Sequence, residues 1–308
     1  MYLAGLNYLL MKFQNFFVVI TAFLMLLVSC EKEDDPGTEP DPPRDRGEQE
    51  LADQQALTEY LDTHFYNAEA FANPGESFDY RIEIDTIDAE NADETPLSAS
   101  PFLEAKTITR EGVDYTIYIL TVRPGVGEEP EFTDSTFVSY SGELLDQTPF
   151  DSSVNPVWFD LSKTIPGFTE ALVEFRAGSG YEVLPDNTVK WNNDYGIGAV
   201  FLPSGLGYFN NPQGNIPPYS PLVFTFSLYR VNQTDHDQDG IASYLEDVNG
   251  DRVIGNDDTD EDLFPNYIDQ DDDGDYIPTE EEIVINADGT ITYPDEDGDT
   301  VPDYLDAE

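Results

Sequence analysis

The sequence has few basic residues and almost no cysteine. Lysine and arginine together number 13 against 64 acidic residues, which gives a formal net charge of −51. Nucleic acids and anionic membrane surfaces would repel such a chain, whereas cations would be attracted to it. The 308 residues are 39% hydrophobic and 13% aromatic, which is enough for a folded core. The composition therefore argues against a nucleic-acid partner and against a wholly disordered chain.

Histidine is also scarce. His64 and His236 are the only two, and both lie outside the β-rich part of the chain. A hydrolase that needs a histidine base is therefore not favoured. We expect His64 to be a packing residue of a helix rather than a ligand.

Cys30 is the only cysteine, which excludes an intramolecular disulfide. It follows an uncharged apolar run, residues 16–28, that is too short to span a bilayer comfortably. The "LVSC" at 27–30 resembles the lipobox of a bacterial lipoprotein signal. This resemblance implies a signal peptide over residues 1–29, for which Met11 is the more natural start, and lipidation of Cys30. An uncleaved signal anchor is the alternative. Several acyl chains would hold the protein firmly on a membrane.

Residues 30–48 are rich in Pro, Asp and Glu and predict a disordered acidic tether, because such a composition cannot bury a core. The "CEKEDD" at 30–35 is similar to the surface-export signal of Bacteroidetes lipoproteins. We therefore expect a cell-envelope lipoprotein of the outer membrane, exposed at the surface.

An N-terminal extension, residues 49–112, comes next. Leu57, Tyr60, Leu61, His64 and Phe65 recur at helical spacing and predict an amphipathic helix from about 48 to 71. The alternating "FDYRIEIDTI" at 78–87 predicts a strand.

A β-rich segment follows, and we expect one domain over residues 113–231. Alternating or apolar runs predict strands at 113–122, 135–144, 198–204 and 222–231. A short helix begins at Pro166 and carries an apolar stripe of Phe168, Ala171, Leu172 and Phe175. The order predicts an α+β fold, in which a curved antiparallel sheet wraps against the short helix. Residues 179–194 are expected to be an insertion.

Aromatic residues are dense around "PFDSSVNPVWFDLSKTIPGF" at 149–168. If the sheet curls over the helix, one group of side chains can converge: Tyr140, Phe150, Asp151, Trp158, Phe159, Ile165, Phe168, Tyr208, Ile216 and Phe224. A plain core is the alternative, but tyrosines and an aspartate fit a dry core poorly. A concave aromatic site with a few polar groups fits better.

Five motifs occur in order over 113–231: "FVSYSGEL", "PFDSS", "TIPGFTEAL", "LPSGLGY" and "IPPYSPLVFTFSL". Together they resemble the FKBP-type peptidyl-prolyl cis-trans isomerases. The family implies isomerisation of proline-containing substrates without a nucleophile, metal or cofactor.

The same resemblance implies a role for each matching residue. Tyr140, Phe150 and Phe224 match the aromatic walls, and Phe168 matches the floor, where the family usually has Trp. Ile216 matches the rim, Asp151 the pocket carboxylate, Tyr208 the phenol donor, and the Ile165 N–H a second donor. Three residues depart from the family pattern: Thr164, Val157 and Phe209.

The last segment, residues 235–308, carries 27 acidic residues against one arginine, a net charge of −26. A twelve-residue pattern begins at 235, 247, 258, 271 and 295, with oxygen-bearing side chains at positions 1, 3, 5 and 12. This is the ligand spacing of an EF-hand calcium loop, in which a Gly near position 6 permits the turn. The adjoining loops leave no room for flanking helices and resemble thrombospondin type 3 repeats.

The pattern predicts structural calcium sites. The expected ligands are Asp235, Asp237, Asp239, Glu246, Asp247, Asn249, Asp251, Asp258, Asp260, Asp262, Asp269, Asp271, Asp273, Asp275, Glu282, Asp295, Asp297, Asp299 and Asp306. A plain acidic spacer is the alternative. The second loop is the weakest, and we expect His236 to point to solvent rather than bind an ion.

The sequence therefore favours a lipid-anchored isomerase and protein-folding helper with a calcium-stiffened C-terminal arm. A second interpretation is a binding module that holds proline-containing peptides with little turnover. A third is a purely structural surface protein, which would have no cavity. The oligomeric state is left open.

Overall fold

The computed structural model describes residues 42–307, so the predicted signal peptide and Cys30 lie outside the described residues. Its centre is a six-stranded antiparallel sheet in the order β3-β4-β9-β10-β5-β6. These strands are β3 (Leu103–Arg110), β4 (Val113–Arg123), β5 (Ser135–Leu144), β6 (Pro149–Asp160), β9 (Gly196–Leu202) and β10 (Leu222–Asn232). The sheet agrees with the expected antiparallel architecture, but it begins at Leu103, ten residues before the predicted boundary.

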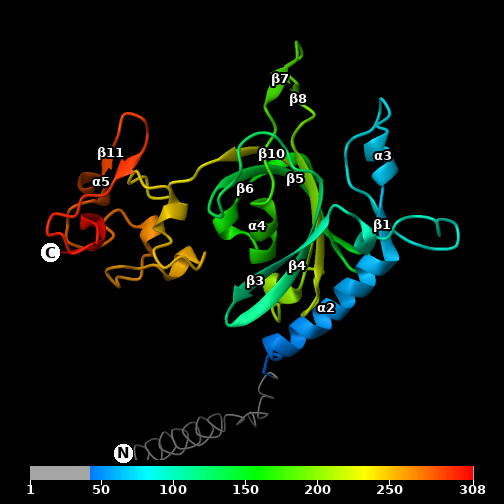
Figure 1. Ribbon diagram of the computed structural model, residues 1–308, viewed down its shortest axis with the longest axis horizontal. Helices are drawn as coiled ribbons and strands as arrows, with labels where there is room; N and C mark the ends of the chain where they lie inside the picture. Colours follow the sequence, from blue (N-terminus) through cyan, green and yellow to red (C-terminus); the bar gives the residue numbers. More distant parts are fainter. Residues whose placement is uncertain (1–41, 308) are drawn as a thin grey trace, which may run out of the picture. The chain divides into compact units, whose positions relative to one another are not determined.

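One helix packs on each face of the sheet (Figure 1). The short α4 (Pro166–Leu172) buries Phe168, Ala171 and Leu172 against one face. The long α2 (Arg46–Thr63) buries Leu57, Tyr60 and Leu61 against the other face. The apolar stripes predicted for both helices are confirmed for these residues, whereas His64, Phe65 and Phe175 lie beyond the ends of the helices.

Strand β9 is the element that both helices share. All seven of its residues are buried. Because successive side chains of a strand point to opposite faces, Val200 and Leu202 join the cluster around α4, whereas Ala199 and Phe201 join the cluster around α2. Gly198 leaves room for the ring of Phe175, which a β-carbon there would overlap. The strand therefore has no exposed face.

The N-terminal extension differs from the prediction at both ends of its helix. Asp45 caps α2 by accepting the Glu48 N–H at 2.9 Å, so the tether predicted to reach residue 48 ends earlier. The helix stops at Thr63 rather than near 71, because β1 (His64–Tyr66) pairs with β2 (Ile84–Thr86). A separate helix, α3 (Ala68–Ala72), follows. Most of the strand predicted at 78–87 is loop.

His64 behaves as a packing residue, as expected. It is buried, and its ring stacks on that of Tyr60 with centroids 3.8 Å apart. Both of its ring nitrogens lie within hydrogen-bond distance of protein oxygens, Nδ1 at 2.9 Å from the Tyr60 carbonyl and Nε2 at 3.2 Å from the Thr86 hydroxyl.

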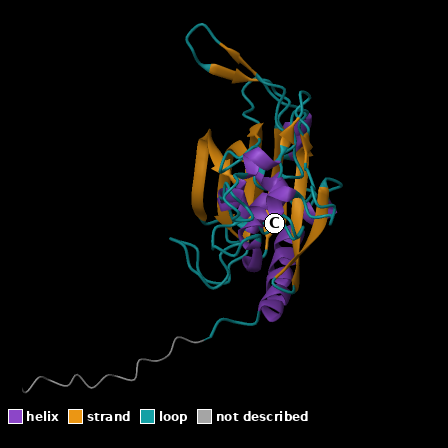
Figure 2. Cartoon of the chain, turned by 90° about the vertical axis from the view of Figure 1, so that its left-hand side faces the viewer, coloured by secondary structure: helices purple, strands orange, loops and turns teal. Residues whose placement is uncertain are grey.

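The predicted insertion is a hairpin, β7 (Tyr181–Val183) and β8 (Val189–Trp191), which extends beyond the sheet (Figure 1, Figure 2). Residues 235–307 contain only short elements: α5 (Thr279–Glu282), β11 (Val284–Ile285), β12 (Ile291–Thr292) and isolated 3₁₀ turns. No helix in residues 42–307 is long and apolar enough to cross a membrane.

A buried glutamate between α2 and the sheet should make the stability of the fold depend on pH. Glu50 of α2 is 7% exposed, and one of its oxygens accepts the Thr116 N–H at 3.0 Å while the other has no partner among the described residues. Burial raises the pKa of this carboxyl to about 7. Because the pKa in the folded state is higher than in the unfolded state, ionisation destabilises the fold as the pH rises from about 4.5 to 7.

Glu50→Gln keeps the acceptor for Thr116 and removes the charge. We therefore expect the unfolding temperature to rise by about 3 °C at pH 8, the equivalent of about 1 kcal/mol. The gain should vanish near pH 4, where the unfolded and folded carboxyls are both protonated. Thermal unfolding followed by circular dichroism measures it, with the exposed Glu59→Gln as the control. An equal gain at both pH values would contradict the argument.

Candidate active site

A cavity of about 540 Å³ opens beside the start of α4. The eight residues predicted for the site all line it: Tyr140, Phe150, Asp151, Ile165, Phe168, Tyr208, Ile216 and Phe224. They come from β5, β6, β10, the N-terminus of α4 and the loop between β9 and β10. Segments far apart in the sequence therefore meet at one hollow, and the roles of these residues remain a prediction.

Buried aromatic rings form the bottom of the cavity. Phe168 is 4% exposed and Phe224 is 7% exposed, and their ring centroids lie 5.1 Å apart. Phe150 packs edge-to-face on Phe224 at 5.4 Å, and Phe159 packs edge-to-face on Phe168 at 6.0 Å. Such edge-to-face contacts are the favoured geometry for aromatic pairs. The bottom of the cavity is therefore apolar and firmly packed.

The pairing of β5 with β6 brings the aromatic walls together. Gly142 of β5 lies opposite Asp151 of β6, and irregularities interrupt the register on either side. A β-carbon at Gly142 would lie 2.5 Å from the Phe150 ring and 2.9 Å from the Phe224 ring. The bare backbone at this position thus makes the room that both rings occupy.

Polar groups stand at the rim of the cavity. The Tyr140 hydroxyl donates to Asp151 at 2.6 Å. Burial, and then this contact with Asp151, raise the pKa of Tyr140, so its phenol stays protonated at neutral pH. Burial also raises the pKa of Tyr208, with a smaller contribution from the charge of Asp151. The Tyr208 hydroxyl has no hydrogen-bond partner within residues 42–307, so it is a neutral donor that faces the cavity unpaired.

A second donor lies at the start of α4. Ile165 is the N-cap residue, and its carbonyl accepts the N–H groups of Phe168 and Thr169 at 3.0 and 3.2 Å. Its own N–H pairs with no acceptor of the described chain. This is the position that an external carbonyl oxygen can use.

The three departures from the family pattern have different locations. Val157 and Phe209 do not line the cavity. Phe209 has a φ of 48°, a left-handed conformation that explains why glycine suits this position better. Thr164 does line the cavity, but its hydroxyl lies 2.6 Å from that of Thr169 and so points into the protein.

Two neighbouring aromatic residues of β6 were both expected at the cavity, but they lie on opposite faces of the strand. Phe159 lines the cavity, whereas Trp158 is 46% exposed and packs on Phe137, so its placement with the cavity group was wrong. Alternation along the strand explains the difference. Sequence reasoning also missed Lys163 and Pro166, and the residues of a tight turn, Gln213, Gly214 and Asn215. Gly214, with a φ of 55° next to Asn215, was the available turn signal.

The acidic repeats share one backbone geometry. In each, the position-1 carboxylate accepts the N–H of position 6 at 2.9–3.2 Å, and the position-5 carboxylate accepts that of position 7 at 2.6–2.8 Å. Position 6 is left-handed in all five, yet only Gly240 is a glycine there. In the other four repeats position 6 is Arg252, Leu263, Tyr276 or Thr300, and in three of them a glycine with a positive φ stands two residues earlier: Gly250, Gly274 and Gly298.

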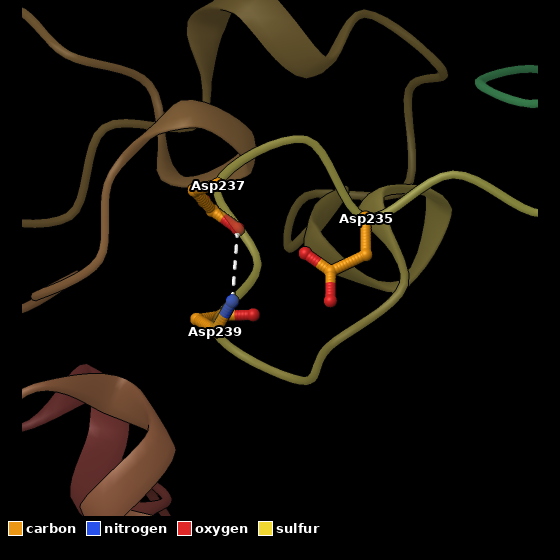
Figure 3. A group of neighbouring side chains, drawn as sticks. All are labelled: Asp235, Asp237 and Asp239. Atoms are coloured by element: carbon orange, nitrogen blue, oxygen red, sulfur yellow. Dashed lines mark hydrogen bonds between the residues drawn. The ribbon is translucent and has the colours of Figure 1, made fainter.

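Carboxylates gather inside these turns. Figure 3 shows Asp235, Asp237 and Asp239 around one turn of the chain. The other groups with oxygens within 4.8 Å of one another include Asp239, Glu246 and Asp272; Asp247, Asp251 and Asp257; Asp258, Asp260 and Asp262; and Asp271, Asp273 and Asp275. Sequence reasoning missed Asp257 and Asp272. Asp257 stands one residue before the expected position 12 of the second repeat. Asp272 belongs to the fourth repeat, but its side chain lies beside Asp239 and Glu246 of the first.

The remaining position-12 carboxylates lie near the groups of their own repeats. Burial, and then the charges of Asp273 and Asp275, raise the pKa of Glu282 to about 7. Burial and the neighbouring aspartates similarly raise the pKa of Asp269 and of Asp306. Asn249 is hydrogen-bonded to its own turn, where it accepts the Asp251 N–H at 2.9 Å.

Many of these oxygens are buried without a partner in the described chain. They include both oxygens of Glu246 and of Asp272, and one oxygen each of Asp237 and Asp239. Burial raises the pKa of Glu246 to about 10 and of Asp272 to about 9. Buried carboxylates are normally paired or bound to metal, so this donor set fits a hard cation that prefers oxygen ligands.

His236 does not point to solvent, so that expectation was wrong. One ring nitrogen lies 3.2 Å from Asp160 at the end of β6, and the other lies 2.8 Å from the Ser243 hydroxyl. It connects the first repeat to the sheet.

Two family models match the chain. The model described as FKBP-type peptidyl-prolyl cis-trans isomerase matches residues 127–229, and the one described as BamM C-terminal matches residues 236–294.

Individual relatives are similar to the chain as well. It is 31% identical over 162 residues to the FKBP-type peptidyl-prolyl cis-trans isomerase FkpA of Aeromonas hydrophila, across 52% of this chain and 53% of the relative. It is 30% identical over 154 residues to the outer membrane protein MIP of Legionella longbeachae, across 47% and 57%. The crystal structure of FkpA from Escherichia coli aligns with a TM-score of 0.36 and 23% identity, across 60% of this chain and 62% of that one.

The chain thus spans about half the length of the curated relatives it matches. The family model and the name of the Aeromonas hydrophila relative specify the same enzyme class. Residues 127–229 are therefore similar to the FKBP-type peptidyl-prolyl cis-trans isomerases.

Proposed function

We propose that the protein is a peptidyl-prolyl cis-trans isomerase whose active site is the aromatic cavity. The observation that carries the proposal is the convergence of eight motif residues, from separate elements, on one hollow with an apolar bottom and donors at its rim. The substrates are proline-containing peptides or proteins, and the compact apolar ring of proline suits a cavity lined by the buried rings of Phe168 and Phe224.

The chemistry requires rotation about an amide bond. Resonance opposes this rotation with a barrier of about 18–20 kcal/mol. A planar amide has the more polar carbonyl and is better solvated by water, so an apolar cavity favours the twisted form over the planar one. The Tyr208 hydroxyl and the Ile165 N–H are placed to hold the substrate carbonyl while the bond turns. Tyr140 keeps Asp151 in place at the rim through their 2.6 Å contact.

Tyr208→Phe removes one donor and keeps the ring. We expect kcat/KM to fall about tenfold in a protease-coupled assay on a proline peptide, because a preorganised hydrogen bond to the carbonyl is lost. Tyr181→Phe, on the β7–β8 hairpin outside the cavity, is the matched control and should retain full activity. A wild-type protein with no rate above background would overturn the proposal.

The same assay distinguishes the isomerase from the second interpretation, a binding module with low turnover. Departures from the family pattern at the cavity would favour low turnover, but two of the three, Val157 and Phe209, lie outside the cavity. Only Thr164 remains at the wall. Peptide binding without acceleration of isomerisation would support the binding module.

We also propose that residues 235–308 bind structural calcium as a thrombospondin type 3-like array. Support comes from the repeated turn geometry and from the buried unpaired oxygens of Asp237, Asp239 and Glu246. Bound calcium would neutralise carboxylates that otherwise repel one another, and would hold the turns closed.

Isothermal titration of the chelated protein with calcium should show at least two bound ions and a raised unfolding temperature. Magnesium should bind more weakly, because it needs a smaller and more regular site. Glu246→Gln should weaken the first repeat, with the exposed Glu261→Gln as the control. Fewer than two bound ions would favour the plain acidic spacer.

We further propose an envelope lipoprotein, lipidated at Cys30 and displayed on the outer membrane. The lipobox-like sequence and the similarity to the outer membrane protein MIP support this location. Cys30→Ala should abolish palmitate labelling and move the protein into the soluble fraction. Labelling that survives the substitution would contradict the proposal.

A further inference from the structure

Helix α2 lies outside residues 127–229, which the family model matches, yet it is hydrogen-bonded to the loop that carries Tyr208. Asp53 of α2 is 2% exposed. One of its carboxylate oxygens accepts both the N–H of Ser204 at 2.8 Å and the hydroxyl of Ser204 at 2.6 Å. The other oxygen accepts the Gln49 amide at 2.6 Å. A buried carboxyl group that accepts three hydrogen bonds holds its partner in a defined position.

Ser204 is in turn hydrogen-bonded to both sequence neighbours of Tyr208. Its carbonyl accepts the N–H of Gly207 at 3.0 Å and the N–H of Phe209 at 2.8 Å. Phe209 has a φ of 48°, a conformation that persists only where surrounding contacts hold it. The backbone on each side of Tyr208 is therefore tied, through Ser204, to Asp53.

The start of α2 holds the same loop from outside. The Arg46 guanidinium stands 4.3 Å from the centre of the Phe209 ring, and that of Arg44 stands 4.3 Å from the Tyr219 ring. The Tyr219 N–H in turn donates to the Phe209 carbonyl at 2.6 Å. The Tyr208 side chain makes no hydrogen bond within residues 42–307, so its place at the cavity depends on its backbone and on the packing of its ring against the core.

We propose that Asp53 is a positioning residue of the isomerase site: by holding Ser204, it keeps the Tyr208 hydroxyl at the cavity. This inference rests on the proposed isomerase function. It makes the N-terminal helix, which the family model does not cover, a working part of the site.

A double-mutant cycle tests the connection. Asp53→Ala should lower kcat/KM about fivefold in the wild-type background but less than about twofold in Tyr208→Phe, because its effect acts through the phenol. Ser204→Ala, which loses only the hydroxyl contact, should show the same pattern in a smaller degree. Asp53→Asn keeps an oxygen acceptor and should restore most of the activity.

Glu50→Ala is the matched control. Glu50 is a buried carboxylate on the same helix, but it accepts the Thr116 N–H of β4 and does not touch the Tyr208 loop. Its effect on kcat/KM should be the same in both backgrounds. The proposal is overturned if Asp53→Ala leaves the activity unchanged, loses as much in Tyr208→Phe, or couples no more strongly than Glu50→Ala.

A spectroscopic measurement separates this inference from the proposed function. In protein labelled with 3-fluorotyrosine, the resonance that disappears in Tyr208→Phe belongs to Tyr208. It should shift or broaden in Asp53→Ala and Ser204→Ala but not in Glu50→Ala, even if no isomerase activity is found. An unchanged resonance in Asp53→Ala would overturn the positioning role while leaving the isomerase proposal standing.

Discussion

The burial of both faces of β9 is the constraint on which the rest of the fold depends. A strand with Val200 and Leu202 on one face and Phe201 on the other cannot lie at a surface, since each exposed side chain of this size would cost about 2 kcal/mol. One helix must therefore cover each face. Helix α4 covers one and forms the bottom of the cavity with Phe168, and α2 covers the other. The N-terminal extension thus belongs to the same folded unit as the site.

The acidic repeats follow a different principle. Their apolar cluster is small, with Ile241, Ile283 and Tyr304 as its buried members. Backbone N–H groups bonded to aspartates define the turns instead, at the expense of close contacts between like charges. Side chains of the repeats contact the β-rich domain: His236 lies 3.2 Å from Asp160, Arg252 pairs with Glu170 of α4 at 2.9 Å, and the Arg252 guanidinium stands 4.5 Å from the centre of the Phe132 ring. The one arginine of this segment therefore meets a carboxylate of the helix that lies under the cavity.

Periodicity and motif spacing predicted four strands of the sheet, the stripe of α4 and the residues around the cavity. They did not predict β6, because its irregular register with β5 breaks the alternation by which a strand is recognised. They overpredicted the strand at 78–87, where Tyr80 has a φ of 59° and pairing is confined to three residues. The contact of Asp53 with Ser204 joins positions 151 residues apart, and no local pattern records it. Side-chain pairs of this kind depend on how two faces meet, which only the assembled fold determines.

The two tyrosines that line the cavity differ in what their hydroxyl groups bind. The Tyr140 hydroxyl donates its hydrogen bond to Asp151 and so has none to give to a substrate. The Tyr208 hydroxyl lines the same cavity and has no partner in the described chain. Burial raises the pKa of both, so each remains neutral and able to donate at physiological pH. A neutral donor suits amide rotation, since the carbonyl gains no full charge as the bond twists and a cation would hold the planar, more polar form. The proposed site thus needs a donor whose position is fixed but whose hydrogen bond is available to a substrate. A phenol held by its backbone and by the packing of its ring, with no hydrogen-bond partner in the described chain, meets that need.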